Sequence, residues 1–284
     1  KKISIPESVE TIGEKAFQDT PWLTLKQEGS TLVIINNKLV DGANCSGNII
    51  IPNGVTSIES SAFADCTGLT GITIPDGVTS IGNSAFSGCD NLVSVTIPES
   101  VTAIGNSAFA NCTGLKSVSL PKQLKKLENW TFIGCAKLTE VTIPDGVADI
   151  GIQAFYNCSN LKTISIPKSV TAIRENAFQN TAWMEAKKAE NPMVIVNAIL
   201  LNGEGCSGNV TIPNTVKIVS GSAFFGCTEL TGVTIPDSVT IIGDSAFSSC
   251  PKLTSVSVPD SVTSLGGSVF SGCSALTEAV VPAG

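Results

Sequence analysis

Histidine is absent from the 284 residues, and this absence removes more chemistry than any other feature of the composition. Histidine is the commonest general base, the usual partner of serine and cysteine nucleophiles, and the commonest metal ligand. No glycine-rich phosphate loop occurs either, because the glycines follow a repeat. Acidic residues are plentiful, so a hydrolase that uses two carboxylates stays formally open. We expect a protein that is not an enzyme and that has no catalytic residue, no metal and no cofactor.

Positive charge and long apolar segments are also scarce. The formal net charge is −7, which gives no electrostatic attraction to nucleic acid or to an anionic membrane surface. No apolar run approaches the roughly 20 residues that span a bilayer, and no basic-then-apolar signal segment opens the chain. Hydrophobic residues make up 42% and charged residues 14%, which is typical of a folded chain. We expect no nucleic-acid partner and no membrane insertion.

What the sequence does contain is one unit repeated every 23 residues. A proline that follows a β-branched or aliphatic residue marks the unit. These prolines are Pro6, Pro52, Pro75, Pro98, Pro121, Pro144, Pro167, Pro213, Pro236, Pro259 and Pro282. They are 23 residues apart except for two gaps of 46, and the frame is kept over twelve periods. Both ends of the chain fall in mid-pattern, so we interpret them as cuts in a longer protein.

The residues of one unit predict a short strand followed by turns. Ile72 and Ile74 alternate with small residues, which is typical of a strand with one buried face. Pro75 ends that strand, because proline cannot donate to a continuing ladder. Val78 is expected to point inward again, and Ala85–Phe86 to form a helical or 3₁₀ turn. A single unit cannot bury its apolar side, so the units must stack on one another.

Ten of the eleven phenylalanines occupy one position of the unit. They are Phe17, Phe63, Phe86, Phe109, Phe132, Phe155, Phe178, Phe224, Phe247 and Phe270. Neighbouring strands of a parallel sheet lie about 4.8 Å apart, which lets successive rings form offset stacks. The repetition therefore predicts a buried column of aromatic rings along the axis of stacking.

The recurring pairs Ile74-Pro75 and Ile81-Gly82, with Ala85-Phe86 followed by Cys89, resemble the BspA-type leucine-rich repeats of bacterial surface proteins. The resemblance covers essentially the whole chain. It implies an α/β leucine-rich-repeat solenoid of about twelve coils, with a parallel β-sheet on the concave side and short strands, turns and 3₁₀ or helical turns elsewhere. It also implies an extracellular protein, at the cell surface or in the cell wall, that binds other molecules. Such a family indicates the fold more strongly than the ligand.

Two longer segments depart from the unit, at about 18–51 and 179–212, within what we interpret as a single solenoid domain over 1–284. Their matching residues are 161 positions apart, or seven periods: Trp22 and Trp183, Val33 and Val194, Asn36 and Asn197, Cys45 and Cys206. The run LVIINNKLV predicts two short strands around the turn-prone pair Asn36-Asn37. Each variant segment is either a spacer coil or a recognition element that carries a tryptophan.

The ten cysteines invite two interpretations that the spacing does not favour. Zinc sites need closely spaced pairs such as C-x₂-C, and none occurs. Eight cysteines recur at the 23-residue period in runs of five and three, so disulfides between neighbours would leave one thiol over in each run. We expect buried free thiols that act as small hydrophobes. Cys45 and Cys206 lie outside the column, and their state stays open.

Acidic residues recur directly after the repeat proline, at Glu7, Asp76, Glu99, Asp145, Asp237 and Asp260. Aspartate is a normal turn former at such a position. We favour this interpretation over an acidic ladder that binds a cation.

The outward positions of the predicted strands form the candidate partner-binding face. Two residues before successive prolines stand Thr73, Thr96, Ser119, Thr142 and Ser165. These hydroxyls either satisfy cross-strand hydrogen bonds or form a shallow platform for an extended partner. Sugar binding favours an exposed aromatic residue, so Trp22 and Trp183 join the candidates. Trp130 takes a position that is serine in many coils, and we expect it to be exposed on the convex side.

Three functions remain after these exclusions. We favour a non-catalytic cell-surface or secreted binding or adhesion module that recognises a host or bacterial protein or glycan. The alternative is a structural stalk that spaces another domain from the cell wall, and an enzyme is the least favoured. The uniform Ser/Thr face favours the stalk, whereas the two tryptophan-bearing segments favour binding. The oligomeric state is not encoded in any pattern, and a monomer is the default expectation.

Overall fold

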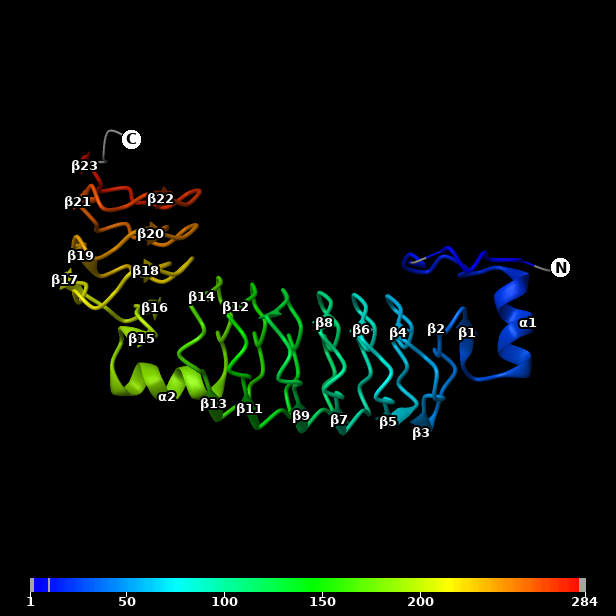
Figure 1. Cartoon of the computed structure of the whole chain (residues 1–284). Helices are drawn as coiled ribbons and strands as arrows, with labels where there is room; N and C mark the ends of the chain where they lie inside the picture. Colours follow the sequence, from blue (N-terminus) through cyan, green and yellow to red (C-terminus); the bar gives the residue numbers. More distant parts are fainter. Residues whose placement is uncertain (1–2, 10, 281–284) are drawn as a thin grey trace. The chain divides into compact units, whose positions relative to one another are not determined.

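The chain forms about 11 turns of a parallel β-solenoid in a computed structural model that describes residues 3–9 and 11–280 (Figure 1). Contacts divide the chain into two compact units. The first runs to Val170 and includes Phe178–Trp183, and the second comprises Thr171–Ala177 and the residues from Met184 onward. The predicted solenoid is therefore confirmed. Among the described residues, no helix has the length and apolar character that crossing a membrane would require.

The first unit contains two series of strands, which are parallel except for the antiparallel pair β1 and β2. Its elements are α1 (Pro21–Gly29), β1 (Val33–Ile35), β2 (Lys38–Asp41), β3 (Gly47–Ile50), β4 (Ser57–Ile58), β5 (Leu69–Thr73), β6 (Ser80–Ile81), β7 (Ser94–Thr96), β8 (Ala103–Ile104), β9 (Ser117–Ser119), β10 (Lys126–Leu127), β11 (Glu140–Thr142), β12 (Asp149–Ile150) and β13 (Thr163–Ser165). One sheet has the order β3-β5-β7-β9, and another has β1-β2-β4-β6-β8. Figure 1 shows these two sheets at opposite edges of the coils.

The second unit repeats this arrangement. It contains β14 (Ala172–Ile173), most of α2 (Ala182–Glu190), β15 (Val194–Val196), β16 (Ile199–Asn202), β17 (Gly208–Thr211), β18 (Ile218–Val219), β19 (Leu230–Thr234), β20 (Ile241–Ile242), β21 (Ser255–Ser257), β22 (Ser264–Leu265) and β23 (Glu278–Val280). The sheets have the orders β15-β16-β18-β20-β22 and β17-β19-β21-β23. Paired residues in successive regular coils are 23 positions apart, as in Val233 with Val256, so the repeat sets the register.

The third side of each coil differs from the helical or 3₁₀ turn expected at Ala85–Phe86. It is a run of hydrogen-bonded turns in which alternate residues bond within the coil and to the next coil. The N–H of Phe86 donates to the carbonyl of Ala108 at 2.8 Å, while that of Ser87 donates to Ser84 at 3.1 Å. Ser84 has the left-handed φ of 53°. The bonds to the neighbouring coil turn every second peptide outward, so a continuous helix cannot form.

The phenylalanine column is the centre of the core. In the first unit, consecutive rings from Phe63 to Phe178 are 5.1 to 5.6 Å apart and almost parallel. In the second unit, Phe224, Phe247 and Phe270 stack at 5.0 and 5.8 Å. The predicted stacks are confirmed within each unit. Phe17 differs, since its ring lies 4.8 Å from that of Trp22.

All ten cysteines are buried free thiols, including Cys45 and Cys206. Six of the eight thiols of the column donate to a phenylalanine carbonyl of the preceding coil, for example Cys89 to Phe63 at 3.1 Å and Cys112 to Phe86 at 3.0 Å, whereas Cys227 donates to the carbonyl of Gly203 at 3.4 Å. The sulfurs of the column are therefore hydrogen-bond donors in the core as well as small apolar groups.

The two variant segments are built alike, each with a nine-residue helix followed by an antiparallel hairpin. The hairpin predicted around Asn36-Asn37 is confirmed, and both asparagines have positive φ. The helix was not expected. It begins because Thr20 replaces the column cysteine: the Thr20 hydroxyl donates to the Phe17 carbonyl at 2.7 Å and accepts from the N–H of Leu23 at 3.2 Å. This is the geometry of an N-cap.

Candidate binding surface

The five candidate hydroxyls of the strand face are brought to one side of the first unit. The register pairs Thr73 with Thr96, Thr96 with Ser119, and Thr142 with Ser165. All five side chains are exposed. Strand alternation produces this arrangement, because the residues on either side of Thr96, namely Val95 and Ile97, are each only 3% exposed.

The hydroxyls of this row are not used to hold the fold together. In the part of the chain that the structure describes, no hydrogen bond engages the hydroxyl of Thr73, Thr96, Ser119, Thr142 or Ser165. A second set of threonines, beside the short strands, behaves differently. Thr79 donates to the Thr56 carbonyl at 3.1 Å, and Thr102 donates to the Thr79 carbonyl at 3.4 Å. The candidate row therefore presents donors and acceptors to solvent, whereas the second set serves the backbone.

A hollow of about 480 Å³ interrupts the row between β9 and β11. Its lining includes the candidate residues Ser119 and Thr142 together with Lys122, Glu140 and Asp145. Among the described residues, no strand pairing joins β9 to β11, and the two belong to separate sheets. The hollow combines hydroxyls with charges of both signs, so it can accept a polar group of a ligand.

The acidic residues that follow the repeat prolines lie in hydrogen-bonded turns. The N–H of Val78 donates to the carbonyl of Pro75 at 3.1 Å, which closes the turn that contains Asp76. Glu99 accepts from the N–H of Lys122 in the next coil at 2.8 Å. Within the described ranges, no group of three or more His, Cys, Asp or Glu side chains is arranged to hold a metal ion.

Trp22 and Trp183 are half-buried residues at the starts of the two helices. The ring of Trp22 lies 4.8 Å from Phe17, and that of Trp183 lies 5.3 Å from Phe178. Trp22 also lines a hollow of about 740 Å³ with Leu25, Lys26 and Ile34 among others. The Nζ of Lys26 is 5.9 Å from the centre of the Trp22 ring, within range of a cation–π contact. Each tryptophan therefore packs on the core with one part of its ring and leaves another part accessible.

Trp130 is the most exposed tryptophan, at 38%, as its serine-like position predicts. Its φ is 59°, a conformation that bulky residues rarely adopt. The indole N–H donates to Oε1 of Gln153 in the next coil at 3.0 Å, which holds the ring in place. The ring lies on the turn side of the coil, away from the hydroxyl row, so the two do not form one site.

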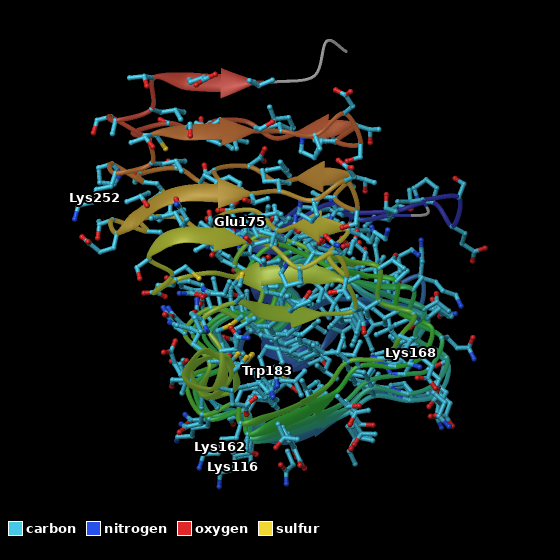
Figure 2. All side chains as sticks on the ribbon, turned by 90° about the vertical axis from the view of Figure 1, so that its left-hand side faces the viewer. Lys116, Lys162, Lys168, Glu175, Trp183 and Lys252 are labelled. Carbon is cyan, nitrogen blue, oxygen red and sulfur yellow. The ribbon has the colours of Figure 1, made fainter. Side chains whose placement is uncertain are left out.

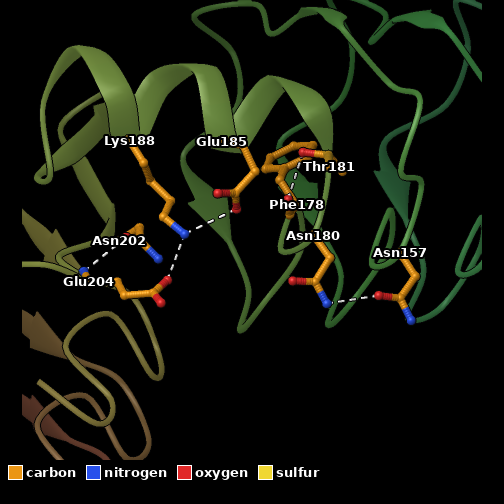
Figure 3. A network of polar contacts seen from close by, with 8 residues as sticks. All are labelled: Asn157, Phe178, Asn180, Thr181, Glu185, Lys188, Asn202 and Glu204. Carbon is orange, nitrogen blue, oxygen red and sulfur yellow. Dashed lines mark hydrogen bonds and ion pairs between the residues drawn. The ribbon is translucent and has the colours of Figure 1, made fainter.

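A polar network holds α2 in place in the second unit (Figure 3). Lys188 Nζ lies 3.0 Å from Glu185 Oε1 and 2.7 Å from Glu204 Oε2. Burial opposes the charged form of Lys188, but the hydrogen bonds to Glu204 and Glu185 outweigh it and raise the pKa of the lysine. The side chain of Lys188 is only 18% exposed. This lysine therefore serves the structure of the variant segment and is not available to a partner.

The fold and the repeated core define a solenoid repeat protein of the leucine-rich class. The BspA-type leucine-rich repeat region, in six copies, matches residues 1–112, 79–199 and 203–284, and the chain belongs to this family. A leucine-rich repeat protein from Bacteroides ovatus is 30% identical over 83% of this chain and 73% of its own, with a TM-score of 0.49. A leucine-rich cell surface protein from Faecalibacterium prausnitzii is 23% identical over 88% and 92%, with a TM-score of 0.51. No curated protein sequence matches the chain.

Proposed function

We propose that this chain is a non-catalytic binding module on the outside of a bacterial cell, and that the hydroxyl row recognises a protein or a glycan. The observation that carries the proposal is the contrast between the two sets of threonines. The exposed row leaves its hydroxyls unbonded in the described residues, whereas the threonines beside the short strands donate to the backbone. No hydrogen bond within the described residues uses these hydroxyls, so they are available to a partner. The absence of histidine supports a non-catalytic role.

The location outside the cell is part of the proposal. Its support is the family, together with the Faecalibacterium prausnitzii structure described as a cell surface protein. Fractionation of the native source and labelling of intact cells with an antibody against the chain test this location. Signal confined to permeabilised cells would contradict it.

The test of binding is a screen of residues 1–284 against arrays of glycans and host proteins. A hit is then measured with the variant Thr73→Val, Thr96→Val and Ser119→Ala, which removes hydroxyls without a large change of shape. We expect this variant to lose at least about tenfold in affinity, since three hydrogen bonds to the partner are removed. The control Thr102→Val removes a hydroxyl that serves the backbone, and it should bind as the unmodified protein does.

The tryptophans contribute a second part of the proposed surface. Trp22 carries the stronger case, because it lines a hollow of about 740 Å³ beside exposed Leu25. Trp22→Phe with Trp183→Phe keeps an aromatic ring on each phenylalanine and removes the indole N–H and the larger ring face. Weaker binding of the array hit would assign the tryptophans to the site, and unchanged affinity would restrict it to the hydroxyl row.

A structural stalk is the second candidate, and the small, uniform side chains of the strand face favour it. A stalk needs no partner for this chain. If residues 1–284 bind nothing on either array although intact cells of the native source do bind, the stalk is the better account.

A further inference from the structure

We propose that Lys116, Lys137 and Lys162 form an anion-binding edge on the first unit, and that its ligand is an acidic polysaccharide. This inference deepens the proposed binding function and rests on it. Lys116 directly precedes β9, Lys137 lies three residues before β11, and Lys162 directly precedes β13. All three side chains are exposed. None of them belongs to the hydroxyl row. We call them the basic edge.

Backbone hydrogen bonds fix the spacing of the basic edge. The N–H of Thr139 donates to the Lys116 carbonyl at 3.3 Å, and the N–H of Lys162 donates to the Thr139 carbonyl at 3.0 Å. Lys116 and Lys162 are thus two coils apart, or about 10 Å at the usual strand spacing. Lys137 is two residues before Thr139, so its Cα lies within about 7 Å of that row. Figure 2 shows Lys116 and Lys162 projecting from the same edge of the ribbon.

The ammonium groups of the basic edge are unpaired. In the described part of the chain, no ion pair neutralises any of the three. The second unit provides an internal comparison, because Lys252 occupies the same repeat position as Lys137. Nζ of Lys252 lies 2.7 Å from Oε2 of Glu229, one period earlier. The residue one period before Lys137 is Gly114, so the equivalent partner is missing.

The basic edge lies in the most lysine-rich part of an acidic protein. Residues 115–168 contain seven lysines and four acidic residues, whereas residues 1–114 contain five lysines and eleven acidic residues. An exposed carboxylate, Glu140, directly follows Thr139 at the start of β11. It reduces the local positive charge without forming an ion pair within 4.0 Å among the described residues.

The surroundings of the lysines favour a polysaccharide over a protein or a nucleic acid. The neighbouring side chains Thr139 and Asn160 are exposed and polar; each donates to a backbone carbonyl, of Lys116 and Ala136 respectively, and its side-chain oxygen can still accept from a sugar hydroxyl. A protein interface usually needs an apolar centre with aromatic anchors, and single-stranded nucleic acid needs exposed rings for stacking. Val93 is the one exposed large apolar residue in this column among the described coils, and Trp183 nearby is packed against Phe178. Cations repeated along an axis match a polymer with repeated anionic groups.

The experiment measures binding of the full chain to immobilised heparin and to polygalacturonate, which carry sulfate and carboxylate groups respectively. Neutral dextran and a single-stranded oligonucleotide are the comparison ligands. We expect binding to at least one acidic polysaccharide, with affinity that falls as salt is raised from 50 to 300 mM because exposed charges are screened. Binding to dextran should be absent, and the oligonucleotide should bind at least about tenfold more weakly.

Variants then assign the binding to these residues. Lys116→Gln, Lys137→Gln and Lys162→Gln combined should weaken it at least about tenfold, from three lost exposed charge contacts. Lys252→Gln, at the paired position of the second unit, should have no effect. Glu140→Gln removes the opposing charge and should tighten binding. Urea unfolding of each variant confirms that the exposed substitutions leave the fold intact.

Three results would overturn the inference. Acidic polysaccharides that fail to bind, or that bind the triple variant and the unmodified chain equally, exclude the basic edge as their site. Equal affinity for the oligonucleotide makes the edge a general polyanion site and removes the assignment to sugars. A protein partner found on the arrays that depends on these lysines would contradict the polysaccharide while leaving the proposed binding function in place.

Discussion

At the scale of single residues, each ring of the phenylalanine column contributes according to how completely its neighbours enclose it. Phe109 is fully buried, with ring neighbours at 5.1 and 5.4 Å. Phe270 has one ring neighbour, at 5.8 Å, and is only partly buried. Removal of a fully enclosed ring costs the transfer free energy and leaves a cavity that the coils on both sides cannot close.

We therefore expect Phe109→Ala to lower the free energy of unfolding by about 3–5 kcal/mol. Phe270→Ala should lower it by clearly less, because its site is already open to water on one side. Urea unfolding followed by circular dichroism measures both values. Equal losses for the two variants would show that stacking between rings adds nothing beyond local burial.

The thiols make a second prediction at the residue scale. Burial raises the pKa of the Cys66 and Cys206 thiols, so they stay protonated in the native protein. The thiolate is the reactive form, and buried sulfurs are also inaccessible. We expect the native protein to react only slowly with a thiol reagent at pH 8, and all ten cysteines to react once urea unfolds it. Rapid reaction of several thiols in the native state would contradict the buried column.

The same pKa shift gives stability a pH dependence. An unfolded thiol ionises near pH 8.5, whereas the buried thiol ionises higher, so the unfolded state releases protons first as pH rises. The contribution of the thiols to stability is therefore complete below about pH 8 and is lost as the pH rises beyond the unfolded value. The urea midpoint should be lower at pH 9.5 than at pH 7. A urea midpoint that rises over this interval would mean that folding lowers the pKa of the thiols instead of raising it.

At the scale of elements, the variant segments close the ring stacks by bringing backbone against a phenylalanine. A Cβ on Gly42 would lie 2.3 Å from Cε1 of Phe63, and a Cβ on Gly203 would lie 2.2 Å from Cε1 of Phe224. Only glycine permits this approach at the two positions, which are 161 residues apart. Both segments therefore end a stack in the same way.

Gly42→Ala should accordingly destabilise the first unit by about 1–3 kcal/mol, because the added methyl forces the ring of Phe63 or the backbone to move. The matched control is Gly29→Ala at the end of α1. Nothing lies within 4 Å of a Cβ there, so this variant should be neutral or slightly more stable. Thermal unfolding of the two variants separates the outcomes, and equal melting temperatures would show that the ring can move without cost.

How far the sequence predicted each element depends on whether the signal was local or periodic. The strand before each repeat proline, its register and the rings followed from the 23-residue period, because stacking repeats one solution, whereas the second strand of each coil, such as β6, was expected to be turn. The hairpin followed from Asn36-Asn37, whose positive φ values suit a tight turn. The helix α1 has local signals, Thr20 as N-cap and Pro21 in the first turn, but these residue types are equally common in the turns of a coil. The turns around Ser84 depend on bonds to the next coil, which no single unit reveals.

At the scale of the whole molecule, the exposed surface was harder to predict than the core. The hydroxyl row was visible as a column, but its freedom from hydrogen bonds required coordinates. The basic edge was missed, although the period contained its signal: Glu229 precedes Lys252 by 23 residues, while Gly114 holds that place before Lys137. The residues that recur in every unit specify the core, whereas a binding site uses positions at which the units differ.

The distribution of hydroxyls over the whole molecule gives a last prediction, which separates a binding surface from a structural wall. Thr79→Val with Thr102→Val removes two hydroxyls that donate to the backbone, and this should cost about 0.5–1.5 kcal/mol for each lost bond. Thr73→Val with Thr96→Val removes hydroxyls that no hydrogen bond engages among the described residues, so the urea midpoint should not fall. Valine also suits an exposed strand at least as well as threonine. A fall of equal size in both variants would mean that the strand face supports the fold, and the case for a surface kept for a partner would then be lost.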